Sequence, residues 1–353
     1  MERKPEEVFR LERDKQLEIF RESAACIFPG CCERAIGSHT FPKSVLKKIS
    51  GGKLFFTTRF EKEDEILRRQ ASASAGVEML FCKHHDDVVF RRIERESENT
   101  DIELFLYLYA YRAFAHEYFF DVYSRVDGGW PDTCAEATHS ALLRGAVKER
   151  YQINEFLSRV LFNKVNPRSE ITSLKELFDS VFSDGELPEL ERFKQNFDLE
   201  YFALDVPPRL MMTGIQTFHF DFFPGSGRIP MVLLLVPSRD AKNSYFAIIS
   251  PKSEREAFCL LRRDFIRHFK EIVTPKSEGF IPMVLLCLLD ASENIVLSDS
   301  LYQQWDKDGS LACFFEVWEQ LTRGRLQAEQ QSEIKSQALI SIRKINLTAW
   351  LAG

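Results

Sequence analysis

Two short stretches decide which fold the N-terminal part of this sequence specifies: CIFPGCCERAIGSHTFPK at residues 26–43 and FCKHHD at residues 81–86. Each holds two potential metal ligands on a short turn, a Cys-x4-Cys pair around Pro-Gly in the first and a Cys-x2-His pair in the second. Tetrahedral zinc takes four nitrogen or sulfur ligands, usually as two such pairs. The sequence therefore predicts one structural Zn²⁺ site with the ligands Cys26, Cys31, Cys82 and His85.

Two alternatives stay open within this ligand set. Cys32 directly follows Cys31, and His84 directly precedes His85, so either neighbour could be the ligand instead. We prefer Cys31 and His85 because they give the commoner spacings. Buried thiols without a metal are common in cytosolic proteins. Clustering favours a metal site, since four of the eight cysteines and three of the seven histidines fall within residues 26–85.

The composition is that of a soluble globular protein, with 353 residues of which 44% are hydrophobic and 28% charged. The first residues, MERKPEEVFRLERDKQ, are too charged for a secretory signal, and no apolar run is long enough to cross a membrane. We therefore expect a cytoplasmic protein that does not use a membrane. Its cysteines are then expected to be thiols or metal ligands, not disulfides.

A basic segment stands out against the acidic chain, whose net charge is −6. Residues 34–60 contain six Lys and Arg residues and no Asp or Glu. Binding of nucleic acid by an acidic protein needs such a local patch. The predicted nucleic-acid-binding residues are the lysines that follow His39, namely Lys43, Lys47, Lys48 and Lys53. A solvated lysine-rich surface without a ligand is the plainer interpretation of the same pattern.

The hydrophobic pattern divides the chain into segments 1–100, 101–190 and 191–353. The middle segment is predicted to be helical, starting with an apolar helix at 101–125 that DGGWPD interrupts. The last segment mixes strand-like and helical spacing, as a mixed α/β domain does. The expected strands there are 217–223, 229–237, 245–250 and 281–289. Further helices are expected at 6–24, 43–49, within 61–76, and at 253–272 and 308–322, with a strand leading into a helix across 77–94.

The N-terminal motifs resemble those of HNH, or His-Me finger, endonucleases. The Cys-x4-Cys pair, AIGSHTFPKS and LFCKHHD follow in the order of that family's treble clef: an opening knuckle, a strand with the catalytic histidine, and a returning ligand pair. The pattern is also similar to that of uncharacterised bacterial proteins with C-x4-C…SH…FCxxHD. The resemblance covers about residues 20–125. The expected fold is therefore α+β, with an N-terminal treble-clef zinc domain, a helical middle region and a C-terminal mixed α/β sheet domain.

The resemblance also implies a chemistry. A neutral histidine can take a proton from water, so His39 would be the general base in phosphodiester hydrolysis. Asp86 would be an oxygen ligand for a second cation, Mg²⁺ or Mn²⁺, distinct from the structural zinc. The implied function is a nucleic-acid-binding protein and divalent-metal-dependent endonuclease, with a role in bacterial defence or DNA processing.

The sequence departs from the family at two points. Position 38 is Ser, where the family often has Asp or His, and no Asn occurs between residues 26 and 98 to match the middle Asn of the motif. The alternative function is a non-catalytic zinc-stabilised module that binds a protein or nucleic-acid partner. A third hypothesis places an enzyme site within residues 191–353, where no motif identifies a chemistry.

Overall fold

A computed structural model describes residues 21, 24–49, 53–57, 67–94, 101–143, 169–182, 189–219, 228–252, 280–326, 337–338 and 340–347. The chain forms two compact units that interleave along the sequence. Unit 1 comprises Met1–Ser38, Val77–Val89 and Ala115–Leu187, and unit 2 comprises His39–Gly76, Phe90–Phe114 and Pro188–Gly353. The segments 1–100, 101–190 and 191–353 were expected to be contiguous domains, and that division stays a prediction. The described residues form a mixed α/β fold with two sheets, and its mixture of helices and strands was predicted.

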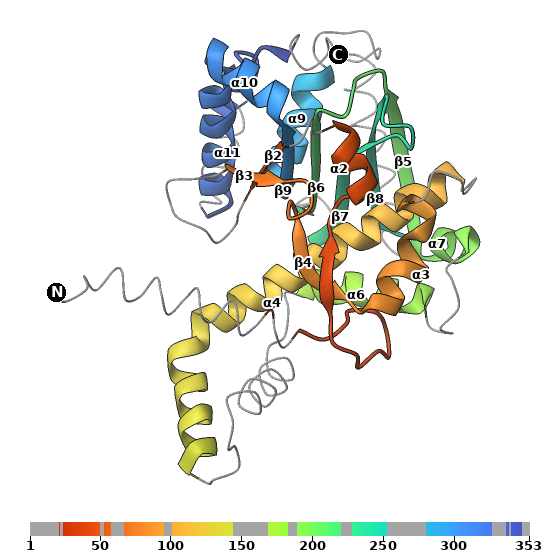
Figure 1. Ribbon diagram of the computed structural model, residues 1–353, viewed down its shortest axis with the longest axis vertical. Helices are drawn as coiled ribbons and strands as arrows, with labels where there is room; N and C mark the ends of the chain where they lie inside the picture. The colour runs from red at the N-terminus through yellow and green to blue at the C-terminus, as the bar shows by residue number, and fades with distance from the viewer. Residues whose placement is uncertain are drawn as a thin grey trace, which may run out of the picture. The chain divides into compact units, whose positions relative to one another are not determined.

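Unit 2 is organised around a seven-stranded sheet with the order β3-β2-β9-β6-β7-β8-β5. Every neighbouring pair in this order is antiparallel. Two of its strands come from the N-terminal part of the sequence: β2 (Lys53–Thr57) pairs with β9 (Ser292–Ser298), and β3 (Leu67–Ala71) pairs with β2. The others are β5 (Phe197–Leu204), β6 (Leu210–His219), β7 (Arg228–Pro237) and β8 (Ser244–Pro251). Figure 1 shows these strands side by side.

The predicted strands at 229–237 and 245–250 are confirmed as β7 and β8. Residues 231–236 of β7 are all buried, so both faces of this central strand are covered, which explains its continuous apolar sequence. Pro230 pairs with Thr217 of β6, whereas the ladder to β8 begins only at Val232. A proline without an N–H therefore costs no bond on the β8 side.

The expectation of a strand at 281–289 is wrong, because these residues form helix α9 (Phe280–Ala291). The hexapeptide IPMVLL thus occurs as a strand at 229–234 and as a helix at 281–286. Pro282 lies in the first turn of α9, where a backbone N–H has no helical partner to lose. Val284, Leu285, Leu288 and Leu289 are buried in the core cluster of the sheet, at helical spacing. Packing on the sheet therefore decides the structure of this apolar run.

The described part of unit 2 contains further helices. These include α2 (Lys43–Ile49), as predicted, α7 (Leu190–Asn196), α10 (Asp299–Asp308) and α11 (Ser310–Leu326). Helix α11 confirms the helix expected at 308–322, and α10 is an additional helix that was not expected. Trp305 of α10 is fully buried, and its indole N–H donates to the carbonyl of Asn346 over 3.1 Å. The expected helix within 61–76 is wrong for residues 67–70, which form β3 together with Ala71 and extend the sheet beside β2. The expected helices at 6–24 and 253–272 lie almost entirely outside the described residues.

Most residues of the elements around the cysteine motifs belong to unit 1, whereas His39 and residues 90–114 belong to unit 2. Strand β1 (Ile36–His39) and β4 (Val77–Phe81) form a two-stranded sheet, and β4 leads into α3 (Lys83–Glu94), as predicted. Helix α4 (Ile102–Leu143) continues through DGGWPD, where a break was expected. Relative to Ala, a Gly in a helix interior costs about 1 kcal/mol and a Pro about 3 kcal/mol, and this helix continues at that cost. Helix α6 (Ser169–Val181) completes the described part of unit 1.

No helix of the described residues is long and apolar enough to cross a membrane.

Candidate metal centre and the surroundings of His39

The opening knuckle is a short hairpin held by backbone hydrogen bonds. The N–H of Cys26 donates to the carbonyl of Glu33 over 2.9 Å, across the two arms of the hairpin. The N–H of Cys31 donates to the carbonyl of Phe28 over 3.1 Å and closes the turn. Gly30 has φ +70° at this turn, a conformation that side chains disfavour. The Pro-Gly sequence thus brings the first two ligands to one side of the knuckle.

The second ligand pair stands where β4 passes into α3. Cys82 directly precedes the helix, and the N–H of Asp86 donates to its carbonyl over 2.9 Å, which makes the first helical turn. His85 lies on that turn, three residues after Cys82. The knuckle is joined to β4 by a bond of 2.9 Å from the N–H of Ile27 to the carbonyl of Leu80. Two rigid backbone turns therefore hold the two pairs together.

The four predicted ligands converge on one point. Their ligand atoms all lie within 4.8 Å of one another. Nδ1 of His85 is 3.2 Å from Sγ of Cys82 and 3.5 Å from Sγ of Cys26, and Sγ of Cys31 is 3.9 Å from Sγ of Cys82. Around a tetrahedral zinc ion, ligand bonds of about 2.0–2.3 Å place neighbouring ligand atoms roughly 3.5–3.8 Å apart. The donor set and its spacing therefore fit one Zn²⁺.

The structure separates the preferred ligands from their neighbours in sequence. Cys32 is exposed, and neither Cys32 nor His84 belongs to the cluster. The imidazole of His85 stacks on the ring of Phe28, with centroids 3.8 Å apart and planes at 10°. The stacking fixes the plane of the His85 ring, and Nδ1 is the ring nitrogen that lies next to the thiols of Cys26 and Cys82.

The charge state of the ligands depends on a cation. Burial raises the pKa of Cys26 to about 12, and burial also raises the pKa of Cys31. Metals bind the thiolate form, so buried thiols at this point need a positive ion to lose their protons. Burial, and next to it the charge of His84, lowers the pKa of His85, which favours the neutral imidazole that a metal requires.

Unit 2 holds the segment that begins with His39. Thr40 is buried, its N–H donates to the carbonyl of Gly76 over 2.8 Å, and its hydroxyl donates to Oδ1 of Asn294 over 3.2 Å. Nδ2 of Asn294 in turn donates to the hydroxyl of Thr213 over 2.7 Å. Asn294 lies on β9 and Thr213 on β6, so the residue after His39 is anchored to the large sheet. Sequence patterns gave no signal for Asn294, because it lies 254 residues away from Thr40.

The imidazole of His39 is held in its neutral form. Burial lowers its pKa most, and the positive charges of Arg112 and Lys43 lower it further. Glu94 and a hydrogen bond to the backbone of Ala73 act in the opposite direction. Nε2 is buried and has no hydrogen-bond partner among the described residues, so the bond to Ala73 belongs to Nδ1. A proton held on Nδ1 leaves the lone pair on Nε2, the form in which histidine acts as a base.

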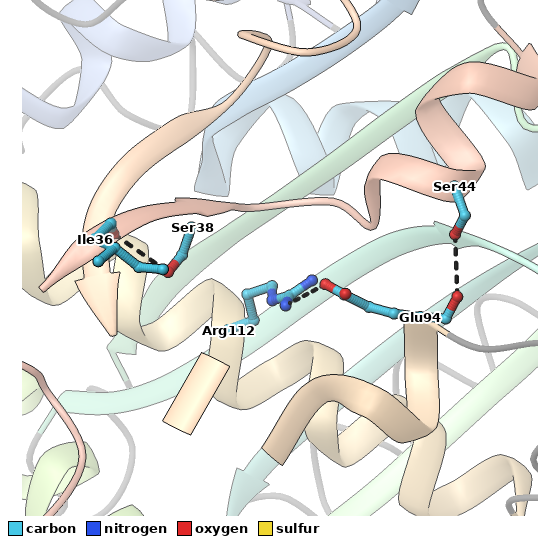
Figure 2. A network of polar contacts seen from close by, with 5 residues as sticks. All are labelled: Ile36, Ser38, Ser44, Glu94 and Arg112. Carbon is cyan, nitrogen blue, oxygen red and sulfur yellow. Dashed lines mark hydrogen bonds and ion pairs between the residues drawn. The ribbon is translucent and has the colours of Figure 1, made fainter. Parts of the chain in front are cut away.

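Arg112 and Glu94, two of the charges that act on this imidazole, belong to a polar network (Figure 2). Nη2 of Arg112 donates to Oε1 of Glu94 over 2.8 Å, and the hydroxyl of Ser44 donates to the backbone carbonyl of Glu94 over 3.2 Å. Arg112 is fully buried, and its guanidinium lies 4.0 Å from the centroid of Phe90. Helices α2, α3 and α4 thus meet in one network through Ser44, Glu94 and Arg112. Arg112 falls within the apolar helix expected at 101–125, where no sequence motif connects it with His39.

His39 and Asp86, which the resemblance assigns to one catalytic site, belong to different units. Asp86 lies half-buried in the first turn of α3 and belongs to unit 1, whereas His39 belongs to unit 2. Their use in one site stays a prediction. Among the described residues, the only cluster of three or more potential metal ligands is that of the cysteines and His85. Ser38 is buried, and its hydroxyl donates to the carbonyl of Ile36 on the same strand over 3.4 Å (Figure 2).

The predicted nucleic-acid-binding lysines are all exposed. Lys43, Lys47 and Lys48 lie on α2, and Lys53 begins β2. Strand β3, which pairs with β2, adds the exposed Arg68 and Arg69. Arg69 forms an ion pair of 2.8 Å with Asp299. The two arginines were not singled out from the sequence because a helix was expected there.

Comparison with known proteins adds no assignment. No protein family, no curated protein and no solved structure matches this chain. The function must therefore be argued from the residues of the two sites.

Proposed function

We propose that this chain is a zinc-stabilised, HNH-like nucleic-acid-binding protein that hydrolyses phosphodiester bonds with His39 as the general base. The observation that carries the proposal is the neutral imidazole of His39, with Nε2 buried and unpartnered among the described residues, near the exposed Lys43. A buried polar atom without a partner is rare and calls for an explanation, and a bound water or substrate atom is one.

Each part of the proposed site would have a distinct task. Nε2 of His39 would take a proton from the attacking water, which requires the neutral form at neutral pH. The lysines Lys43, Lys47, Lys48 and Lys53 would hold the phosphate backbone without reading its sequence. Asp86 would bind Mg²⁺ or Mn²⁺, which supplies charge neutralisation at the phosphate when bound. The zinc cluster would stabilise the fold and take no part in the chemistry.

Cleavage assays with a matched pair of histidine variants test this proposal. The full chain, His39→Ala and His84→Ala would be incubated with plasmid, single-stranded DNA and RNA, each with Mg²⁺ or Mn²⁺. Loss of a general base typically lowers the rate about 10²–10⁴-fold, so we expect that loss for His39→Ala. His84 is exposed and lies outside the zinc cluster, so the His84→Ala variant should cleave at the same rate as the unaltered chain. An inactive chain, or equal rates for all three proteins, would overturn the proposal.

A non-catalytic binding module is the second candidate. Ser38 in place of a metal ligand favours it, because its hydroxyl is engaged with Ile36. A binding titration with labelled DNA and RNA separates the two functions. Affinity that falls steeply with salt, together with no cleavage under any condition, supports the module over the nuclease. Absence of binding to both nucleic acids would leave a protein partner as the ligand of such a module.

A further inference from the structure

We infer that the Arg112–Glu94 ion pair is a positioning device for His39: it braces the segment that follows His39 and keeps a fixed positive charge near the imidazole. The inference rests on the proposed role of His39 as a base. It concerns two residues to which neither the motif pattern nor the resemblance gives a role.

The geometry of the pair indicates that its place is fixed. Arg112 is fully buried, with one side of its guanidinium on Phe90 and Nη2 on Glu94. A buried charge is costly to leave without its partner, so the two side chains hold each other. The backbone carbonyl of Glu94 also receives the hydroxyl of Ser44, on the first turn of α2. The pair therefore braces helix α2, which begins four residues after His39.

The two charges of this pair change the pKa of His39 in opposite directions. Arg112 favours the neutral imidazole, and Glu94 favours the protonated one. The other groups acting on the imidazole are Lys43 on α2, which favours the neutral form, and the backbone of Ala73, which favours the protonated form. Because Arg112 is withdrawn from water, its charge is screened less than that of an exposed lysine. Because Glu94 is partly exposed, its charge should change the pKa of His39 less than the charge of Arg112 does.

The test compares two substitutions that should shift the pKa of His39 in opposite directions. In the zinc-loaded full chain, the imidazole of His39 would be titrated by NMR, assigned through His39→Gln. Arg112→Met removes a positive charge and should raise the pKa of His39. Glu94→Gln removes a negative charge and should lower that pKa. Arg112→Lys keeps the charge and should leave the titration close to that of the unaltered chain.

The outcomes separate this inference from the proposed function. A merely structural role for the pair would move the pKa of His39 in the same direction for both substitutions or leave it unchanged, and either result overturns the inference. This readout does not require cleavage, so it stands even if the chain proves not to be a nuclease. If cleavage is found, the acidic limb of its pH–rate profile should move to higher pH in Arg112→Met and to lower pH in Glu94→Gln. Should Arg112→Met fail to fold, Glu94→Gln at the half-exposed partner still decides the sign.

Discussion

The metal centre and the surroundings of His39 are built in contrasting ways. The metal centre takes its ligands from two tight turns, each with both ligands within a few residues of sequence. His39 is surrounded by residues from distant segments: Ala73 after β3, Glu94 at the end of α3 and Arg112 on α4. The spacing of ligands can be recognised in one sequence, whereas a setting assembled from distant segments cannot.

The largest effect is expected at the metal centre. Cys26→Ser or Cys82→Ser removes one of four ligands, and bound structural zinc contributes apparent free energies of about 10–16 kcal/mol in zinc-finger peptides. We expect about one zinc per chain in the unaltered protein, loss of that zinc in either variant, and a much lower melting temperature. Metal analysis and thermal unfolding measure both, and hydrogen exchange should report the loss of protection within residues 24–38 and 77–89.

Cys32→Ser is the matched control for this prediction. Cys32 is exposed and next to a ligand but outside the cluster, so its substitution should leave zinc content and melting temperature unchanged. A folded chain that carries no zinc would contradict the metal centre. So would equal losses in the ligand variants and in the control.

The same contrast explains how much could be predicted from the sequence. The two ligand pairs, helix α2, the strand leading into α3, and the strands β7 and β8 follow from local spacing and were predicted. The two copies of IPMVLL show where local spacing fails, because one is a strand and the other a helix. The two copies differ in their surroundings. The first continues as a strand to Pro237 between β6 and β8, and the second packs as a helix on the sheet.

Long-range contacts account for the other differences. Residues 67–70 were expected to be part of a charged helix, but their backbone forms the edge of the sheet beside β2. Asn294 could not be connected with Thr40 from one sequence, since nothing in either segment encodes the other. The treble clef and the use of Asp86 with His39 rest on the resemblance and stay predictions.

The second largest effect is expected at the anchor of the His39 segment. Asn294→Leu keeps a similar volume but removes the bonds to Thr40 and Thr213, all three being buried. Leaving a buried polar group unsatisfied costs about 1–3 kcal/mol, so the free energy of unfolding should fall by at least that amount. Urea unfolding measures it, and zinc content should not change.

A double-mutant cycle sharpens this result. Thr40→Val alone removes one hydroxyl and should cost less than Asn294→Leu. If the bond between Thr40 and Asn294 is formed, the double variant should be less destabilised than the sum of the two single variants. Strict additivity would show that the sheet does not anchor this segment.

A smaller effect is expected at Gly37 of β1. A Cβ atom at this position would lie 2.7 Å from Cγ1 of Val77, so Gly37→Ala forces a shift between β1 and β4. Overpacking of this kind costs typically about 1–3 kcal/mol, at the lower end where the neighbour can move. The added substitution Val77→Ala removes the clashing methyl group and should restore part of the lost stability. No destabilisation by Gly37→Ala would contradict the close packing of these two strands.

The smallest effect links the exposed lysines with His39. Lys43→Gln and Lys53→Gln each remove one exposed charge, so each should weaken binding to nucleic acid and reduce the salt dependence of log K by about one charge. Their effects on His39 should differ. Lys43 is one of the charges that lower the pKa of His39 below its ordinary 6.5, so its loss should raise that pKa and make the base protonate at higher pH. Lys53→Gln removes the same charge as Lys43→Gln and therefore serves as its control. If the two variants shift the titration of His39 equally, or neither does, Lys43 acts only as a phosphate contact, and the electrostatic setting of His39 is confined to its buried neighbours.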